Sequence, residues 1–135
     1  MDVADLAKAQ AVNRVLLGAG LIALPGVFGR VWSGREAGDD RAQVLARALG
    51  ARDLALGASG LVALREGDRT WSSRAFAAQA LGDAVDLVAV LSAGRALGRS
   101  TRALAGTMAA GSAGVAAAYA WRLRGERDLD SPIQR

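Results

Sequence analysis

Four charged residues near the middle of the chain carry the clearest chemical potential. Arg52 and Asp53 are adjacent, and Asp83 and Asp86 lie three positions apart, which places these two carboxylates on one face of a helix. Cysteine and histidine are both absent, so disulfides, zinc fingers, thiol catalysis and Ser-His-Asp arrangements are excluded. What remains is the chemistry of carboxylate and guanidinium groups. We expect no catalytic residue, no metal and no cofactor, because no nucleophile-base pair or metal-ligand set is visible.

Helices are the elements that must position these four residues. Long apolar segments separated by polar loops predict an all-α fold, a four-helix antiparallel transmembrane bundle made of two helical hairpins. The predicted helices cover about residues 5–31, 42–64, 74–97 and 103–123. They form one domain over residues 1–124, and residues 125–135 are predicted to be a polar C-terminal tail.

The length of the apolar segments favours a membrane location. Nineteen consecutive uncharged residues lie between Arg102 and Arg122, and about 20 residues suffice to cross a hydrocarbon core about 30 Å thick. A second uncharged run covers residues 15–29, so the first and fourth helices carry most of the membrane signal. A mean hydropathy of +0.20 and 22% charged residues argue the other way. A soluble all-α bundle, with Asp83 and Asp86 facing water, is therefore an alternative.

The short loop between the second and third predicted helices makes them antiparallel. A turn centred near residues 69 and 70 sets Asp53 level with Asp86 and Asp83 less than a turn away, so Arg52 can pair with both helix-three carboxylates. An unpaired charge at this depth would cost about 2.5–3.5 kcal/mol on insertion scales. The favoured interpretation is that the cluster fixes the register of the central hairpin. The alternative is a polar cavity that binds an ion, a proton or a small anionic group.

Small residues predict where the helices approach one another. Gly50 and Gly57 flank Arg52, and Gly82 precedes Asp83, so we expect a close approach within the central hairpin. On the fourth predicted helix, small residues at a four-residue spacing form one packing stripe, made of Gly106, Ala110, Gly114 and Ala118. Both patterns are typical of helices that associate in lipid.

The six aromatic residues all lie at or near predicted helix ends. They are Phe28, Trp32, Trp71, Phe76, Tyr119 and Trp121. Aromatic side chains favour the interface between hydrocarbon and water, whereas a soluble bundle would normally place them in its core. The placement therefore predicts an interfacial aromatic belt.

The chain is basic, with a net charge of +4. Its arginines lie at segment ends and no aromatic platform accompanies them, which favours anionic lipid headgroups over nucleic acid. We expect the lipid bilayer as the main partner, a membrane protein or a second copy of the chain as further partners, and no nucleic acid. A small excess of basic residues on the side of the termini predicts that both termini are cytoplasmic.

The stretch LARALGARDLALGASGLVAL, followed by ALGDAVDLVAVL, resembles the pattern of small uncharacterised four-helix inner-membrane proteins of actinobacteria and related high-GC bacteria. Their shared features are an arginine in the first helix, a G-x-R-[DE]-x-x-x-G stretch in the second and an acidic pair in the third. The matching positions are Arg14, the run from Gly50 to Gly57, and Asp83 with Asp86. The resemblance covers about residues 14–95. It implies an inner-membrane location and no established activity.

These features predict a small integral membrane protein without catalytic chemistry, in a structural, accessory or interaction role. Its Arg-Asp cluster is expected to fix the central hairpin. The alternative function is that of a small transporter or an ion- or proton-handling protein that uses Arg52, Asp83 and Asp86.

Overall fold

The computed structural model describes residues 3–27, 40–93 and 98–130, except for the side chains of Ser100 and residues 125–130. Four long helices make up nearly all of this part of the chain: α1 (Val3–Ala23), α3 (Asp40–Glu66), α4 (Arg69–Ser92) and α5 (Arg99–Asp130). No strand occurs among the described residues. The predicted all-α class is therefore confirmed, although the helix boundaries differ from the prediction.

The first helix is shorter than predicted, because Pro25 interrupts it. α1 ends at Ala23, Leu24 is not helical, and a short helical turn follows at 25–27. Proline lacks the N–H group that an α-helix needs, and its ring clashes with the carbonyl group four residues earlier. The prediction continued this helix to residue 31, but residues from 28 to 39 lie outside the described part of the chain.

The last helix is longer than predicted. α5 continues to Asp130, so residues 125–130 of the predicted polar tail are helical. Glutamate, arginine and leucine are good helix formers, and extending an existing helix is far easier than nucleating a new one. A polar composition argues against burial of a segment but does not argue against a helix. Residues 131–135 are outside the described part of the chain.

A two-residue turn joins α3 to α4. Gly67 ends α3 with a positive φ of 70°, a conformation that side-chain-bearing residues rarely adopt. Asp68 then caps α4, because its carboxylate accepts hydrogen bonds from the backbone N–H groups of Thr70 and Trp71 at 2.7 and 3.1 Å. Residues 65–73, expected to form a loop, are therefore mostly helical.

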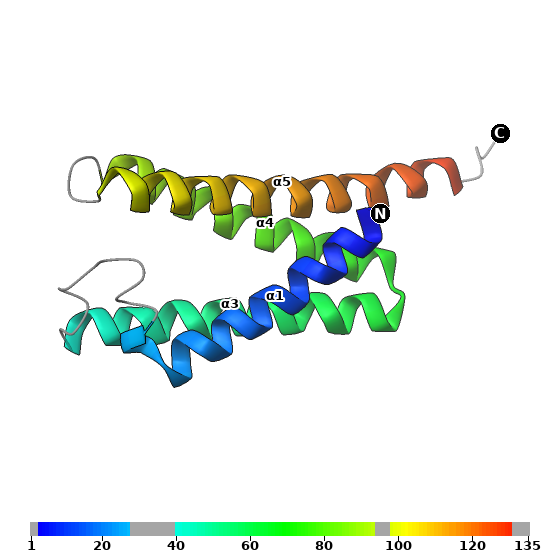
Figure 1. The fold of residues 1–135 in the computed structure, drawn as a ribbon. Helices are drawn as coiled ribbons and strands as arrows, with labels where there is room; N and C mark the ends of the chain where they lie inside the picture. Colours follow the sequence, from blue (N-terminus) through cyan, green and yellow to red (C-terminus); the bar gives the residue numbers. More distant parts are fainter. Residues whose placement is uncertain (1–2, 28–39, 94–97, 131–135) are drawn as a thin grey trace.

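The helices are arranged as two pairs (Figure 1). α1 crosses α3 obliquely and α4 runs alongside α5, and the tightest packing lies within these pairs. The pairs meet through α3 with α4 and through α1 with α5, where contacts are fewer. The start of α1, the end of α5 and the α3–α4 turn lie at one end of the molecule (Figure 1). The central hairpin α3–α4 is thus joined more loosely than the two outer hairpins, contrary to the prediction.

Glycines bring α1 and α3 together. A Cβ atom on Gly57 would lie 2.7 Å from the carbonyl oxygen of Ala11, and one on Gly50 would lie 2.7 Å from that of Gly18. A Cβ atom on Gly82 would meet its nearest neighbour only at 3.7 Å. Gly50 and Gly57 do allow a close approach, but their partner is α1 and not α4, because their side of α3 faces the first helix.

The small-residue stripe predicted on the last helix faces outward. Gly106 is half-buried, whereas Ala110, Gly114 and Ala118 are exposed, and a Cβ atom on Gly114 would meet nothing within 4 Å. Other residues of α5 face the interior, namely Ala105, Ala116, Tyr119, Ala120 and Leu123. A four-residue spacing identifies one face of a helix but not the direction in which that face points, so this packing prediction is wrong for the bundle interior.

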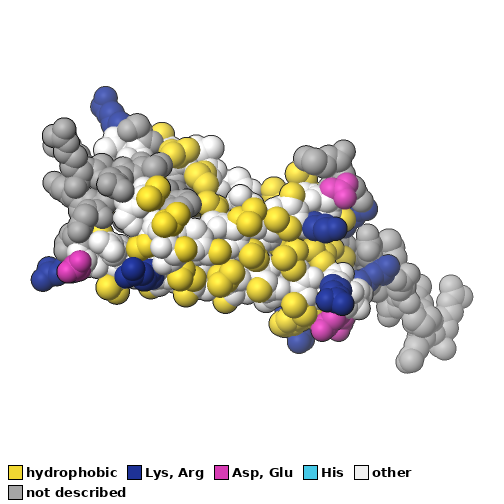
Figure 2. Space-filling view, turned by 60° about the horizontal axis from the view of Figure 1, so that its bottom comes forward, with side chains coloured by type: hydrophobic (Ala, Val, Ile, Leu, Met, Phe, Trp, Pro, Cys, Tyr) yellow, Lys and Arg dark blue, Asp and Glu magenta, His cyan; other side chains and the backbone are white. Residues whose placement is uncertain are grey.

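The interior of the bundle consists mostly of small and polar side chains, and many large apolar side chains are exposed. Among the described residues, the largest fully buried side chains are those of Phe76, Gln79 and Ser73. Large apolar residues are exposed on every helix, for example Leu16, Leu45, Val85 and Leu104. On the face shown in Figure 2, hydrophobic side chains cover the middle of the molecule and charged ones lie toward its two ends. Soluble proteins bury such large apolar residues preferentially, so this distribution is the reverse of theirs.

Two of the aromatic residues belong to the interior. Phe76 is fully buried and Tyr119 nearly so, and their rings meet edge to face with centroids 4.8 Å apart. Trp71 and Trp121 are exposed. The interfacial prediction is wrong for Phe76 and Tyr119, because position along a helix does not determine which face a residue occupies. Two further predicted interface residues lie outside the described part of the chain, Phe28 and Trp32.

Within the described residues, two helical segments are long and apolar enough to cross a membrane, Arg69–Ser92 in α4 and Thr101–Arg124 in α5. The part of α1 that the structure describes does not meet the same criterion, so the prediction that the first helix carries a leading membrane signal is wrong for that part. α1 ends before Pro25 and includes Asp5, Lys8 and Arg14. α4 remains apolar on average although it contains two aspartates.

Candidate functional site

A buried ion-pair network lies between the helices, and its centre is Arg14 of α1. The guanidinium group donates one hydrogen bond through Nη1 to Oδ1 of Asp53 on α3, at 2.8 Å, and one through Nη2 to Oδ1 of Asp83 on α4. The Arg14 and Asp83 side chains are each 6% exposed, and that of Asp53 is 15% exposed. We call Arg14, Asp53 and Asp83 the inner triad.

A second ion pair lies beside the inner triad. Arg52 Nη1 and Nη2 donate to the two carboxylate oxygens of Asp86, at 2.8 and 2.6 Å, a bidentate geometry. These side chains are 34% and 35% exposed, and we call them the outer pair. Arg52 Nη2 also lies 3.3 Å from Oδ1 of Asp53, so the outer pair and the inner triad form one network.

The fourth helix joins the network through Ser112 of α5. Its hydroxyl oxygen accepts hydrogen bonds from Arg14 Nη2 at 3.2 Å and from Gln10 Nε2 at 2.8 Å. Gln10 Nε2 also donates to the backbone carbonyl of Ser112 at 3.0 Å. Every long helix that the structure describes therefore contributes to the network.

Helical spacing explains why these side chains meet. On α1, Ala7, Ala11, Arg14 and Gly18 are buried at intervals of four, three and four residues, which is one face of a helix. Small neighbours on that face let α3 approach, and a Cβ atom on Gly57 would lie only 2.9 Å from Arg14 Cβ. Arg14 is thus packed beside α3 and its guanidinium group reaches inward.

The α4 side of the network is likewise one helix face. Gln79, Asp83 and Asp86 follow at intervals of four and three residues. Gln79 is fully buried, and its Nε2 donates to the backbone carbonyl of Leu56 on α3 at 3.1 Å. This bond fixes α4 against α3 one turn away from the ion pairs.

The structure brings together all four charged residues singled out from the sequence but distributes their bonds differently. Arg52 bonds to Asp86, as expected, whereas Asp83 bonds to Arg14 and not to Arg52. Asp53 accepts from both arginines. The cluster therefore joins the two helix pairs and is not confined to the central hairpin.

Sequence reasoning missed Arg14 as an interior partner, together with three polar residues, Gln10, Gln79 and Ser112. The resemblance identified Arg14 as the first-helix arginine of the pattern, but no partner was predicted for it. One signal could have found it, namely the small residues Ala7, Ala11 and Gly18 on the same helix face. An arginine on a face of small residues is favourably placed to point into a bundle.

The charges of the network do not balance. Its two guanidinium groups face three carboxylates, which leaves one negative charge in excess. Oδ2 of Asp83 is buried and accepts no hydrogen bond, and the same holds for the side-chain oxygens of Gln10 and Gln79. An excess carboxylate with a free oxygen can take up a proton or a small cation. No group of three or more acidic, histidine or cysteine side chains within the described ranges could hold a metal ion.

No protein-family model matches the chain, and neither a curated protein nor a solved structure is significantly similar to it. The resemblance to the actinobacterial inner-membrane proteins therefore stays a prediction.

Proposed function

We propose that the chain is an integral membrane protein whose four long helices all cross the bilayer, and that it has a structural, accessory or interaction role without catalytic chemistry. The observation that supports the membrane location is the inverted distribution of side chains. The interior holds ion pairs, small residues and a few large apolar side chains such as Phe76, whereas many large apolar residues lie outside on all four helices. An exposed apolar surface of this extent is an aggregation liability in water, whereas in lipid it is the expected outer surface.

The spacing of charged residues along the helices supports the same proposal. On α3, Arg47 and Arg65 lie 18 positions apart, about 27 Å along a helix. On α5, Arg102 and Arg122 lie 20 positions apart, about 30 Å. Both distances match the thickness of a hydrocarbon core, about 30 Å. The charged residues that lie between these limits on α3 are Arg52 and Asp53, which belong to the network.

The absence of cysteine allows a direct test in the full chain. Single-cysteine variants E66C, beside the α3–α4 turn, and V85C, on the exposed middle of α4, are treated with a water-soluble maleimide in isolated membranes. We expect labelling of E66C and protection of V85C until SDS dissolves the membrane. If V85C reacts as readily as E66C in intact membranes, the spanning bundle is wrong and the soluble all-α alternative is favoured.

The same E66C variant tests the predicted orientation. Because the α3–α4 turn lies at the same end of the molecule as the start of α1 and the end of α5 (Figure 1), an orientation with these helix ends on the cytoplasmic side places Glu66 in the cytoplasm too. E66C in whole cells should then react with an impermeant maleimide only after permeabilisation. If E66C is labelled in intact cells, the predicted orientation is wrong, whereas the proposal that the helices span the membrane is unaffected.

Within this proposal the ion-pair network stabilises the helix arrangement. The supporting observation is that its hydrogen bonds join all four helices. Asp86→Asn removes the charge that holds Arg52 and should destabilise the protein, and the exchange variant R52D/D86R should recover part of the loss. A melting temperature in detergent that is the same for the parent and D86N would contradict a stabilising role of the outer pair.

Ion or proton handling is the second candidate function, and the excess negative charge of the network favours it. Asp83 is the residue with the free, buried carboxylate oxygen. We would compare the parent, D83N and D86N in reconstituted vesicles that carry a pH gradient or a sodium gradient. This function requires that the parent dissipates one gradient faster than empty vesicles do and that folded D83N loses the activity. A parent no faster than empty vesicles would leave only the structural role.

A further inference from the structure

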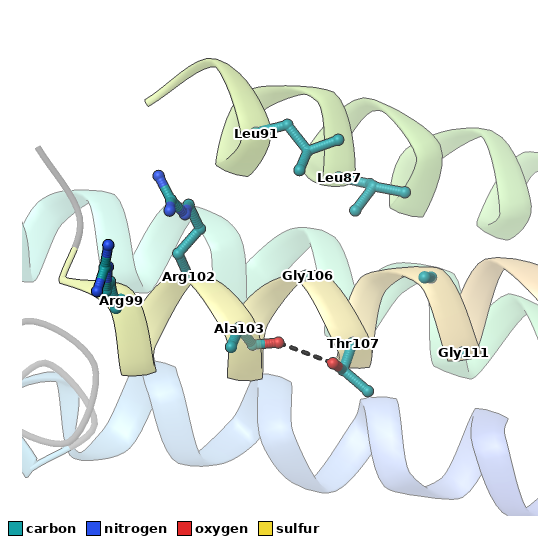
Figure 3. A pocket seen from close by; sticks show the side chains of 9 residues that line it. Leu87, Leu91, Arg99, Arg102, Ala103, Gly106, Thr107 and Gly111 are labelled. Carbon is teal, nitrogen blue, oxygen red and sulfur yellow. Dashed lines mark hydrogen bonds between the residues drawn. The ribbon is translucent and has the colours of Figure 1, made fainter. Parts of the chain in front are cut away.

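A surface groove runs between the end of α4 and the start of α5 (Figure 3). Its volume is about 740 Å³, and it is open to the outside. Leu87 and Leu91 of α4 form one wall, and the opposite wall consists of small residues of α5, including Ala103, Gly106 and Ala110. Figure 3 shows both leucine side chains pointing toward α5 across the groove.

Large residues of α4 and small residues of α5 face each other along the groove. A Cβ atom on Gly106 would lie 3.8 Å from Leu87 Cδ1, an ordinary van der Waals contact, so the helices approach each other closely there and the groove is an open trough along their surface. Leu91 is 64% exposed and Ala110 is exposed as well. The trough is therefore apolar along its length and faces the surroundings of the protein.

One end of the groove is positively charged. Arg99 and Arg102 both line it at the start of α5, and no acidic residue is among its lining residues. A groove with a cationic end and an apolar body is complementary to a molecule with an anionic end and an apolar chain.

We propose that this groove binds one anionic phospholipid, an inference that rests on the membrane location proposed above. The phosphate group lies at Arg99 and Arg102, at the level where headgroups meet water, and one acyl chain lies on the surface trough along Leu87, Leu91 and the small residues of α5. Basic pockets between membrane helices recognise anionic headgroups in this way. Arg102, at the cationic end of the groove, lies 20 residues from Arg122 along α5, about 30 Å. This distance matches the thickness of a hydrocarbon core, so the cationic end lies at one membrane surface when Arg122 lies at the other.

The headgroup is tested by removing charge. The parent, R99Q/R102Q and the control R65Q/R74Q are purified in mild detergent, and binding of phosphatidylglycerol and phosphatidylcholine is measured by native mass spectrometry. The control removes two arginines from the opposite end of the bundle, beside the α3–α4 turn. We expect one phosphatidylglycerol per parent chain and an affinity about thirtyfold lower in R99Q/R102Q, as the loss of two surface arginines implies. The control should bind like the parent.

The acyl chain is tested by filling the groove without changing charge. Gly106→Leu places a side chain in the trough, and Gly114→Leu is the matched control, because Gly114 lies on the same outward stripe but does not line the groove. G106L should lose phosphatidylglycerol binding and G114L should retain it.

The outcomes separate this inference from the membrane proposal. Equal binding of phosphatidylcholine and phosphatidylglycerol, or unchanged binding in R99Q/R102Q, would overturn the lipid site while V85C stays protected in the membrane. A lipid-free parent that forms dimers, with dimers lost in G106L, would make the groove a contact between two copies instead. Labelling of V85C in intact membranes would overturn the membrane proposal itself.

Discussion

The inner triad and the outer pair are neighbouring ion pairs of the same chemistry that differ in burial and in the number of helices they join. Arg14 and Asp83 are each 6% exposed, and the triad joins α1, α3 and α4 directly and α5 through Ser112. Arg52 and Asp86 are about one-third exposed and join α3 to α4 alone. The pair that sequence reasoning placed at the centre of the molecule is thus the more peripheral of the two.

Depth along the helices does not add to this difference. Both guanidinium groups contact Oδ1 of Asp53, Arg14 at 2.8 Å and Arg52 at 3.3 Å, so the two sites lie at nearly the same depth. What separates them is shielding from water, because the Arg14 and Asp83 side chains are buried and those of Arg52 and Asp86 are one-third exposed. A shielded ion pair depends fully on its partners, and we infer that the inner triad contributes more to stability than the outer pair.

Arg14→Gln should have the largest effect of the single substitutions considered. It removes the cation that bonds to Asp83, and removing one partner of a buried ion pair costs about 3–5 kcal/mol. Arg52→Gln removes the same charge from the half-exposed pair, for which we expect about 1 kcal/mol. The free energies of unfolding of both variants are measured by SDS titration in mixed micelles.

Asp83→Asn in the Arg14→Gln background is the control for this comparison. It removes the carboxylate that was left unpaired, so part of the stability should return. Equal losses in Arg14→Gln and Arg52→Gln would break the comparison, because they would mean that the outer pair is as well shielded from water as the triad.

A second contrast concerns the glycines beside the two ion pairs. Gly57→Ala places a methyl group 2.7 Å from the carbonyl oxygen of Ala11, so α1 must move away from α3 and disturb the triad. Overpacking of this kind typically costs about 1–3 kcal/mol. Gly82→Ala lies near the outer pair, where the new methyl group meets its nearest neighbour at 3.7 Å. We expect the free energy of unfolding of G82A to lie within about 0.5 kcal/mol of that of the parent in the same titration.

Tolerance of G57A would mean that α1 can slide on α3 without loss of the Arg14 bonds. The close approach at Gly57 would then be a consequence of the fold and not a requirement for the inner triad. A large decrease in the free energy of unfolding of G82A would show that α3 and α4 are packed more tightly than their few contacts indicate.

The sequence was sufficient to predict the helices but not the direction of their faces. Apolar runs bounded by arginines identified the first and fourth helices, and partly apolar segments between polar loops identified the other two, because length and hydropathy are properties of a single segment. Gly114 was predicted to pack against another helix but faces outward, and Phe76 was predicted to lie at the membrane interface but is buried. Both predictions were wrong because the direction of a helix face depends on the helix that packs beside it. That information lies in the packing of α1 on α3 and of α4 on α5, which no single segment contains.

The same limit explains what sequence reasoning found of the network. Arg52 and Asp86 lie on consecutive helices joined by a short turn, so counting residues from the turn was enough to place them level. Arg14 and Asp83 are 69 residues apart on helices that are not consecutive. Counting from a turn cannot relate such residues, and a charge beside an apolar run is usually interpreted as a membrane flank.

Among the substitutions of network residues, Ser112→Ala should have the smallest effect, and it tests whether α5 belongs to the inner triad. The variant loses the hydroxyl oxygen that accepts from Arg14 and Gln10, although the Ser112 carbonyl still accepts from Gln10 at 3.0 Å. Hydrogen bonds between membrane helices average about 0.6 kcal/mol, and we expect a loss of this size.

Thr107→Ala is the matched control for α5, because the Thr107 hydroxyl donates only within its own helix, to the Ala103 carbonyl at 2.8 Å (Figure 3). We compare the decrease in the free energy of unfolding in S112A with that in T107A. A larger decrease in S112A that disappears in the Arg14→Gln background would show that Ser112 acts through Arg14. If S112A and T107A unfold alike, α5 is held by apolar contacts such as Phe76 with Tyr119. The inner triad would then join three helices rather than four, and its advantage over the outer pair would rest on burial alone.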